Sequence, residues 1–97
     1  MKGEFYIAQP IPEYNPNRVK VGFSTNLSRR EQDHRCTNPN FRTVKTYQAR
    51  REWEKSLIQG LASEFKFLNN EVLECDDISR VIVYCDQFFQ KIKIDPN

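Results

Sequence analysis

The sequence lacks any long hydrophobic run. Its longest strongly apolar stretch is the five residues from Val81 to Cys85, whereas a membrane-spanning helix needs about 20. The first residues, Met-Lys-Gly-Glu-Phe-Tyr, contain none of the apolar core of a secretory signal peptide. We therefore expect an intracellular protein with no membrane contact.

Paired metal ligands are also scarce. The chain has three cysteines and one histidine, and no Cys-x-x-Cys pair is present to anchor a zinc site. The odd number and the spacing of the cysteines do not fit a disulfide framework. Cys85 falls on the apolar stripe of a predicted final helix, where a small buried thiol is the commoner role. We favour buried thiols over a zinc site.

The size and the charge distribution suggest one domain with an anionic partner. Ninety-seven residues suffice for a single domain, 1–97, with a modest core over about 3–92. Residues 1–51 hold ten Lys or Arg against four acidic residues, whereas residues 52–97 hold five against nine. A basic half of a small domain indicates an anionic partner, and nucleic acid is the usual one. An ordinary solvated surface would explain the charge as well.

The periodicity predicts strands alternating with helices. Strands are expected at 4–9, 18–24 and 41–48, with a turn and a short last strand within 69–74. Helices are expected at 26–35 and 50–65, and after a cap at Asp76 or Asp77. The proline-rich segment 10–17 and residues 36–40 are expected to be loops.

The first two strands predict a hairpin with two distinct faces. Because side chains alternate along a strand, one face is apolar and carries Phe5, Ile7, Val19, Val21 and Phe23. Tyr6 and Lys20 then lie together on the opposite face. Tyr6 could equally be a sheet aromatic with no chemical role.

The segment from Val19 to His34 is the strongest functional pattern. A strand that runs into a helix N-terminus leaves backbone N–H groups free, and these favour an anion such as phosphate. Arg30 and His34 are four residues apart and share a helix face, with Lys20 on the preceding strand. A capping box of Ser28 and Glu31 is expected at the start of this helix.

Glu54 stands out in the helix predicted at 50–65. The apolar residues from Trp53 to Phe65 span an arc of roughly 140°, and Glu54 falls near its middle. A carboxylate on an apolar face costs several kcal/mol unless it is compensated. Its partner is either a metal ion or a nearby Lys or Arg in a structural salt bridge.

Taken in order, these residues resemble a known family, the GIY-YIG nuclease domain. The resemblance spans about residues 3–73 and rests on four pieces of sequence: Phe5-Tyr6-Ile7, Lys20-Val21-Gly22, Ser24-x-Asn26-Leu27-x-x-Arg30-x-x-x-His34, and Glu54 within Trp53-Glu54-Lys55-Ser56-Leu57 followed by Glu71-Val72-Leu73. The first motif carries Glu4 where the family has glycine. Lys20 replaces the second tyrosine, as in a branch with a Lys-hydrophobic-Gly form.

The resemblance implies an α+β fold with a small three-stranded antiparallel sheet flanked by helices. It also implies hydrolysis of DNA with one divalent metal. Glu54 would hold the metal, Mg²⁺ or Mn²⁺, and Tyr6 would activate or orient water, with Lys20 as its supporting cation. Arg30 would neutralise charge on the phosphate, and His34 would contact the phosphate or assist proton transfer.

Two functions therefore follow from the sequence. The first is a metal-dependent DNA endonuclease with Tyr6, Lys20, Arg30, His34 and Glu54 in its site. The second is a catalytically inactive module of the same fold that binds nucleic acid or a protein. Specificity would come from the loops at 10–17 and 36–40, from a homodimer or from a partner protein.

Overall fold

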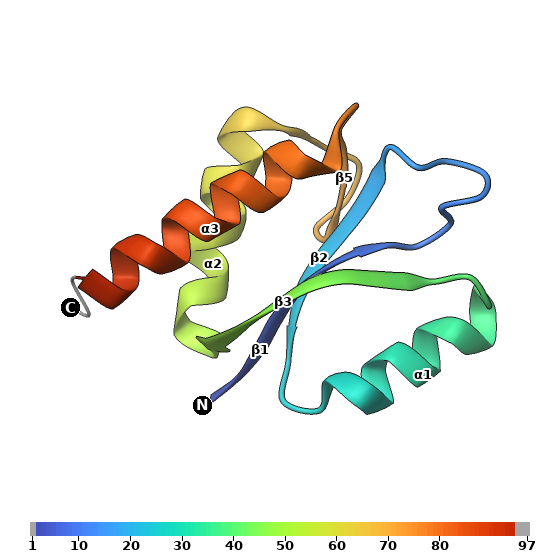
Figure 1. Cartoon of the computed structure of the whole chain (residues 1–97), viewed down its shortest axis with the longest axis horizontal. Helices are drawn as coiled ribbons and strands as arrows, with labels where there is room; N and C mark the ends of the chain where they lie inside the picture. Colours follow the sequence, from blue (N-terminus) through green and yellow to red (C-terminus); the bar gives the residue numbers. More distant parts are fainter. Residues whose placement is uncertain (1, 95–97) are drawn as a thin grey trace.

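The sheet of this protein lies between two unequal helical layers (Figure 1). A computed structural model describes residues 2–94, with side chains as far as Ile92. The elements in chain order are β1 (Lys2–Gln9), β2 (Arg18–Ser24), α1 (Leu27–Thr37), β3 (Arg42–Arg50), α2 (Arg51–Glu64), β4 (Lys66–Phe67), β5 (Val72–Glu74) and α3 (Ile78–Ile94). This confirms the α+β class. Within the described range, no helix has the length and apolar character needed to cross a membrane.

Over residues 2–94 the sheet has five strands in the order β3-β1-β2-β5-β4, and every pair is antiparallel. The prediction of three strands is therefore wrong. The three long strands were expected, and β5 confirms the short strand within 69–74. The two-residue β4 was not predicted, because it is too short to show an alternating pattern.

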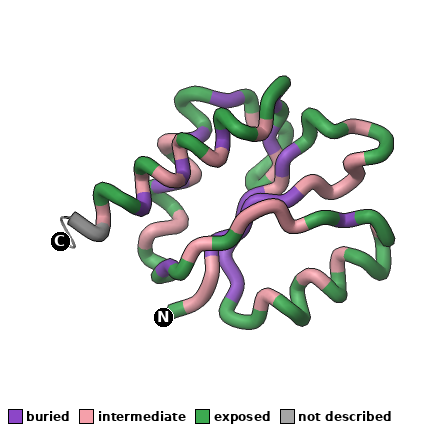
Figure 2. The backbone as a smooth tube through the Cα atoms, in the orientation of Figure 1, coloured by how far each residue is buried: buried purple, intermediate pink, exposed green. Residues whose placement is uncertain are grey.

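The hairpin of β1 and β2 has the predicted faces. Phe5 pairs with Phe23 and Ile7 with Val21, and all four side chains are buried in the main core. This core lies under α2 and α3, which contribute Leu57, Leu61, Val81, Cys85 and Phe89. Figures 1 and 2 show both helices on this one side, with buried positions facing the sheet. The buried Cys85 agrees with its predicted place on the apolar stripe.

The opposite face of the sheet is covered by α1 alone among the described helices. Its buried cluster is small and consists of Tyr6, Ala8 and Phe41, with Leu27 packed against it. The helix itself has no buried residue and is exposed or half-buried along its whole length (Figure 2). A helix held this lightly can present its side chains to a ligand.

The caps of the helices differ in part from those predicted. The capping box of Ser28 and Glu31 is wrong, because the side chain of Asn26 accepts from the backbone N–H of Arg29 at 3.2 Å. Glu31 accepts instead from the Thr43 hydroxyl at 2.6 Å and so ties α1 to β3. At α3 the predicted cap is confirmed, since Asp77 accepts from the backbone N–H of Ser79 at 3.0 Å.

Candidate active site

Tyr6 lies at the centre of the candidate site, on the face of the sheet that α1 covers. Its partner in register is Gly22 of β2. A Cβ atom built at Gly22 would lie only 3.0 Å from the Tyr6 hydroxyl oxygen, so the phenol ring crosses directly over the glycine. A glycine at this position therefore leaves room for the Tyr6 side chain to extend from β1 over β2. Tyr6 is only 3% exposed.

His34 meets Tyr6 from α1. The Tyr6 hydroxyl and His34 Nε2 are 3.5 Å apart, and which of them donates depends on the imidazole tautomer. The imidazole also stacks on Phe41, with ring centroids 4.5 Å apart and an angle of 15° between the planes. These contacts fix both the height and the tilt of the imidazole above the sheet.

Arg30 lies one turn before His34 and is exposed. Within the described residues, no hydrogen bond or salt bridge engages its guanidinium group, although its charge lowers the pKa of both Tyr6 and His34. His34 contacts Tyr6, and Arg30 acts on the same phenol through its charge, from the helix face that the spacing predicts for both. The guanidinium keeps its donors available for an anion.

Lys20 lies on the same face as Tyr6, as the alternation predicted, but its ammonium group is engaged elsewhere. It donates to Glu71 Oε2 at 2.6 Å, and only 14% of the Lys20 side chain is exposed. The carbonyl oxygen of Glu71 also accepts from the backbone N–H of Val21 at 2.9 Å. Arg30 is a cation that lowers the pKa of Tyr6, and the expected support of Tyr6 by Lys20 stays a prediction.

Glu71 is a site residue that the sequence analysis missed. The segment from Glu71 to Leu73 was noted only as part of the family resemblance. The available clue was an acidic residue just before a short strand that could pair with the strand of Lys20. That pairing occurs, since β5 runs beside β2 from Arg18 to Lys20.

Glu54 reaches the site from the other helical layer. Arg51 in the first turn of α2 reaches the end of β2, since its Cζ lies 5.3 Å from the ring centroid of Phe23. Glu54 lies three residues later, on the same side of the helix. Within the described residues, β5 pairs with β2 only as far as Lys20, so the outer edge from Gly22 to Ser24 has no partner strand. We call this edge, from Gly22 to Ser24, the open edge of β2.

The carboxylate of Glu54 has no protein partner over residues 2–94, where no hydrogen bond or salt bridge to it is found. The predicted alternative of a structural salt bridge is therefore absent from this part of the chain. Glu54 is half-buried, and its charge acts on Tyr6, whose pKa it raises. An anionic group held near the sheet without a partner is suited to a cation from solution.

The electrostatics of the site keep Tyr6 protonated and His34 neutral. Burial, followed by the charge of Glu71, raises the pKa of Tyr6 to about 12, against the opposing effect of Arg30. Burial lowers the pKa of His34 below its ordinary value, and the charges of Lys20 and Arg30 lower it further. At neutral pH the site therefore pairs a phenol with a neutral imidazole, which is a proton donor beside a proton acceptor.

The residues present fit a divalent ion that needs few protein ligands. Among the described residues, no group of three or more His, Cys, Asp and Glu is arranged to hold a metal. Mg²⁺ is commonly bound through one or two carboxylates together with substrate phosphates and water. Glu54 would supply one such carboxylate, and Arg30, whose charge acts on the same phenol, would be available to a phosphate.

Comparison of the chain with protein-family models, with curated proteins and with solved structures finds no match. The function is therefore argued from the site itself.

Proposed function

We propose that this chain is a metal-dependent DNA endonuclease with a single-metal site of the GIY-YIG type. The observation that supports the proposal is that Tyr6 lies over Gly22 of β2, contacts His34 of α1 and is acted on by the charges of Arg30 and Glu54. An unpaired carboxylate, an unpaired guanidinium and a phenol–imidazole pair are the groups that phosphodiester hydrolysis requires.

In this proposal Tyr6 and His34 act together on the attacking water. A phenol whose pKa is about 12 cannot act as a base at neutral pH unless it passes on its own proton. His34 Nε2 is 3.5 Å away, and the lowered pKa of His34 keeps the imidazole neutral and able to accept that proton. Tyr6 then takes a proton from water as it loses its own to His34.

Arg30 and Glu54 serve the phosphate in this proposal. The Arg30 guanidinium neutralises the charge that develops on the non-bridging oxygens, with donors that no other described residue uses. Glu54 would hold Mg²⁺ or Mn²⁺, which when bound supplies Lewis-acid polarisation of a phosphate oxygen. The charges of Lys20 and Glu71 act on His34, and that of Glu71 also acts on Tyr6.

DNA is the proposed substrate because the exposed surface around the site is basic. Arg29, Arg30 and Arg35 are exposed on α1, and Arg42 and Arg50 are exposed at the two ends of β3. Contacts of this kind are made mainly to phosphates, so affinity should fall steeply as salt rises. A homodimer or partner protein would add sequence specificity, as the sequence analysis proposed.

A catalytically inactive module that binds nucleic acid or a protein is the second candidate. It is favoured by one observation, the 2.6 Å salt bridge that engages Lys20 with Glu71. In the catalytic resemblance this lysine should help form a phenolate, yet here the pKa of Tyr6 is raised. Such a site would bind DNA through phosphate contacts and leave it intact.

The deciding experiment is cleavage of plasmid and oligonucleotide DNA with Mg²⁺ or Mn²⁺ by wild type and Glu54→Gln. We expect metal-dependent cleavage by wild type and none by Glu54→Gln, with metal-free DNA binding retained. Because the carboxylate has no partner among the described residues, the variant should be at least as stable as wild type. Glu64→Gln, at the exposed end of the same helix, is the matched control and should cleave normally.

Binding without cleavage by wild type would favour the inactive module. Equal cleavage by wild type and Glu54→Gln would refute the role of Glu54.

A further inference from the structure

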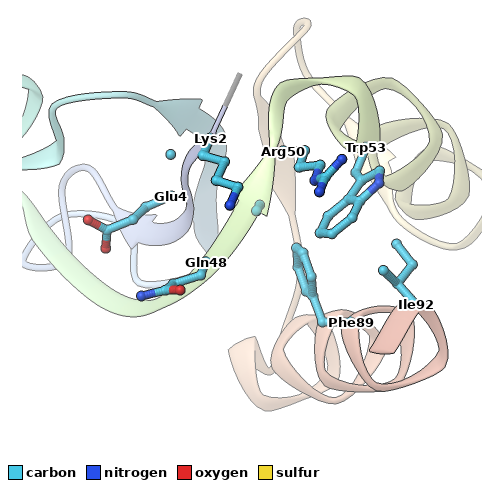
Figure 3. A pocket seen from close by; sticks show the side chains of 9 residues that line it. Lys2, Glu4, Gln48, Arg50, Trp53, Phe89 and Ile92 are labelled. Carbon is cyan, nitrogen blue, oxygen red and sulfur yellow. The ribbon is translucent and has the colours of Figure 1, made fainter. Parts of the chain in front are cut away.

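A hollow that the candidate active site does not include lies where β1, β3, α2 and α3 meet (Figure 3). Its volume is about 520 Å³, which is in the range of small-ligand sites. The proposed nuclease chemistry uses none of the side chains that line it. Its composition therefore needs a separate explanation.

One wall of this hollow is aromatic and apolar. Trp53, Phe89 and Ile92 point towards it in Figure 3. The rings of Trp53 and Phe89 meet edge to face, with centroids 6.4 Å apart. One side of Phe89 is already occupied by the stacked ring of Tyr47 at 4.5 Å. The half-buried indole of Trp53 is therefore the surface on which a flat ligand could stack.

The other side of the hollow is cationic. Lys2 and Arg50 are partners in the register of β1 and β3, and both side chains are exposed. Arg50 Cζ lies 6.0 Å from the ring centroid of Trp53. Over residues 2–94, neither cation has an ion pair. Glu4 contributes one carboxylate to the lining, but Figure 3 shows it pointing away from Trp53.

We propose that this hollow binds an unpaired nucleobase of a DNA strand, stacked on Trp53, with the adjoining phosphate held by Lys2 and Arg50. Sites for single-stranded nucleic acid combine such a stacking surface with cations that follow the backbone. An apolar ligand would gain nothing from two cations. A base inside a continuous duplex cannot reach the indole, because its faces are covered by its neighbours.

The position of the hollow links it to the candidate active site, and this inference rests on the proposed action on DNA. Trp53 and Glu54 are neighbours in the first turn of α2, with side chains about 100° apart. Glu4 of β1 lines the hollow, and Tyr6 of the candidate site lies two residues further along the same strand, about 7 Å away between Cα atoms. The substrate class is therefore DNA with an unpaired base close to the cut.

The fluorescence of Trp53 tests this directly, because it is the only tryptophan in the chain. Glu54→Gln protein in metal-free buffer is titrated with a continuous duplex, the same duplex with a one-base bulge, and a single-stranded oligothymidine. We expect the bulged and single-stranded DNA to quench Trp53 saturably. They should also bind roughly five- to tenfold more tightly than the continuous duplex, as one stacked base predicts.

Two further variants separate the hollow from general electrostatics. Arg50→Gln should lower the preference for unpaired bases to less than about twofold. Arg42→Gln, at the opposite end of the same strand, should weaken binding to all three DNAs equally and keep the preference. Equal affinity for bulged and continuous duplex, or an unaltered preference in folded Arg50→Gln, would overturn the proposal.

This readout requires neither metal nor cleavage. Cleavage by wild type without any preference for unpaired bases would refute the binding of a base in the hollow and would still support the nuclease proposal. Saturable quenching of Trp53 in a protein that never cleaves DNA would support the hollow as a binding site and refute the nuclease proposal.

Discussion

The two faces of the sheet differ in how many apolar side chains they bury beneath their helices. Beneath α2 and α3 lies a continuous apolar core, in which Leu57, Leu61, Val81 and Cys85 are fully buried. Beneath α1 the buried cluster is Tyr6, Ala8 and Phe41, and the helix has no buried residue. Apolar burial scales with the area removed from water, so most of the folding free energy comes from the α2 and α3 face.

This difference shows how a chain of 97 residues can combine stability with a polar site. The core on one face holds β1 and β2 in register, and the register fixes Tyr6 over Gly22. The other face carries a buried phenol, a half-buried imidazole and an exposed guanidinium, with a smaller apolar cluster around them. Substitutions on the two faces should therefore have separable effects.

The largest expected effect is on stability. Leu57→Ala should destabilise the fold by about 2–5 kcal/mol, because it empties a fully buried position between α2 and the sheet. Leu27→Ala, at a half-buried position of α1, should cost less than half as much. Urea unfolding of both variants measures the difference. Equal losses would show that the two faces contribute alike.

A smaller effect is expected at Gly22, and it should fall on activity. A Cβ atom here would lie 3.0 Å from the Tyr6 hydroxyl, so in Gly22→Ala the phenol must shift by a few tenths of an ångström relative to His34. We expect cleavage to fall by about tenfold or less, since the shift is smaller than the misplacement of about 1 Å that costs roughly a hundredfold. DNA affinity and the urea midpoint should change little. Full activity in Gly22→Ala would mean that the position of Tyr6 over β2 is unimportant.

The smallest effect concerns the titration of His34, the only histidine in the chain. Lys20→Met should raise the pKa of His34, because the charge of Lys20 lowers it. Lys45→Met is the matched control, since Lys45 pairs with Asp86 on the opposite face at 2.7 Å. The imidazole NMR signals, followed against pH, measure both shifts. A rise in the pKa of His34 in Lys45→Met but not in Lys20→Met would place Lys20 outside the site.

The lowered pKa of His34 makes the stability of the fold depend on pH. Over the pH range in which His34 titrates, the unfolded chain binds more protons than the folded one. The free energy of unfolding therefore falls as the pH drops below about 6.5. Lys20→Met should reduce this loss, because it brings the folded pKa of His34 closer to the unfolded value. Unfolding midpoints on both sides of pH 6.5 test the sign.

Local patterns were enough to predict much of the fold. The alternation from Phe5 to Ile7 and from Val19 to Phe23 predicted which side chains enter the core, because a strand has a period of two. The same argument placed Tyr6 and Lys20 on the other face. The cap at Asp77 was predictable because it involves neighbours in the sequence.

Contacts between distant segments could not be predicted in this way. Glu31 fits a capping box by its spacing, yet Thr43 of β3 engages it, and no local pattern contains that contact. The partner of Lys20 proved to be Glu71, which is 51 residues away. For Glu54, the helical arc indicated a carboxylate near the core. The absence of a protein partner in the described range emerged only from the three-dimensional arrangement.

The most direct test of the account is the effect of Mn²⁺ on the NMR signals of His34. A paramagnetic ion held by Glu54 should broaden the imidazole resonances, because the charge of Glu54 acts on Tyr6 and the Tyr6 hydroxyl contacts His34 at 3.5 Å. The account predicts strong broadening at substoichiometric Mn²⁺ in wild type and its loss in Glu54→Gln, with Glu64→Gln like wild type. Equal broadening in wild type and Glu54→Gln, or none in either, would contradict it.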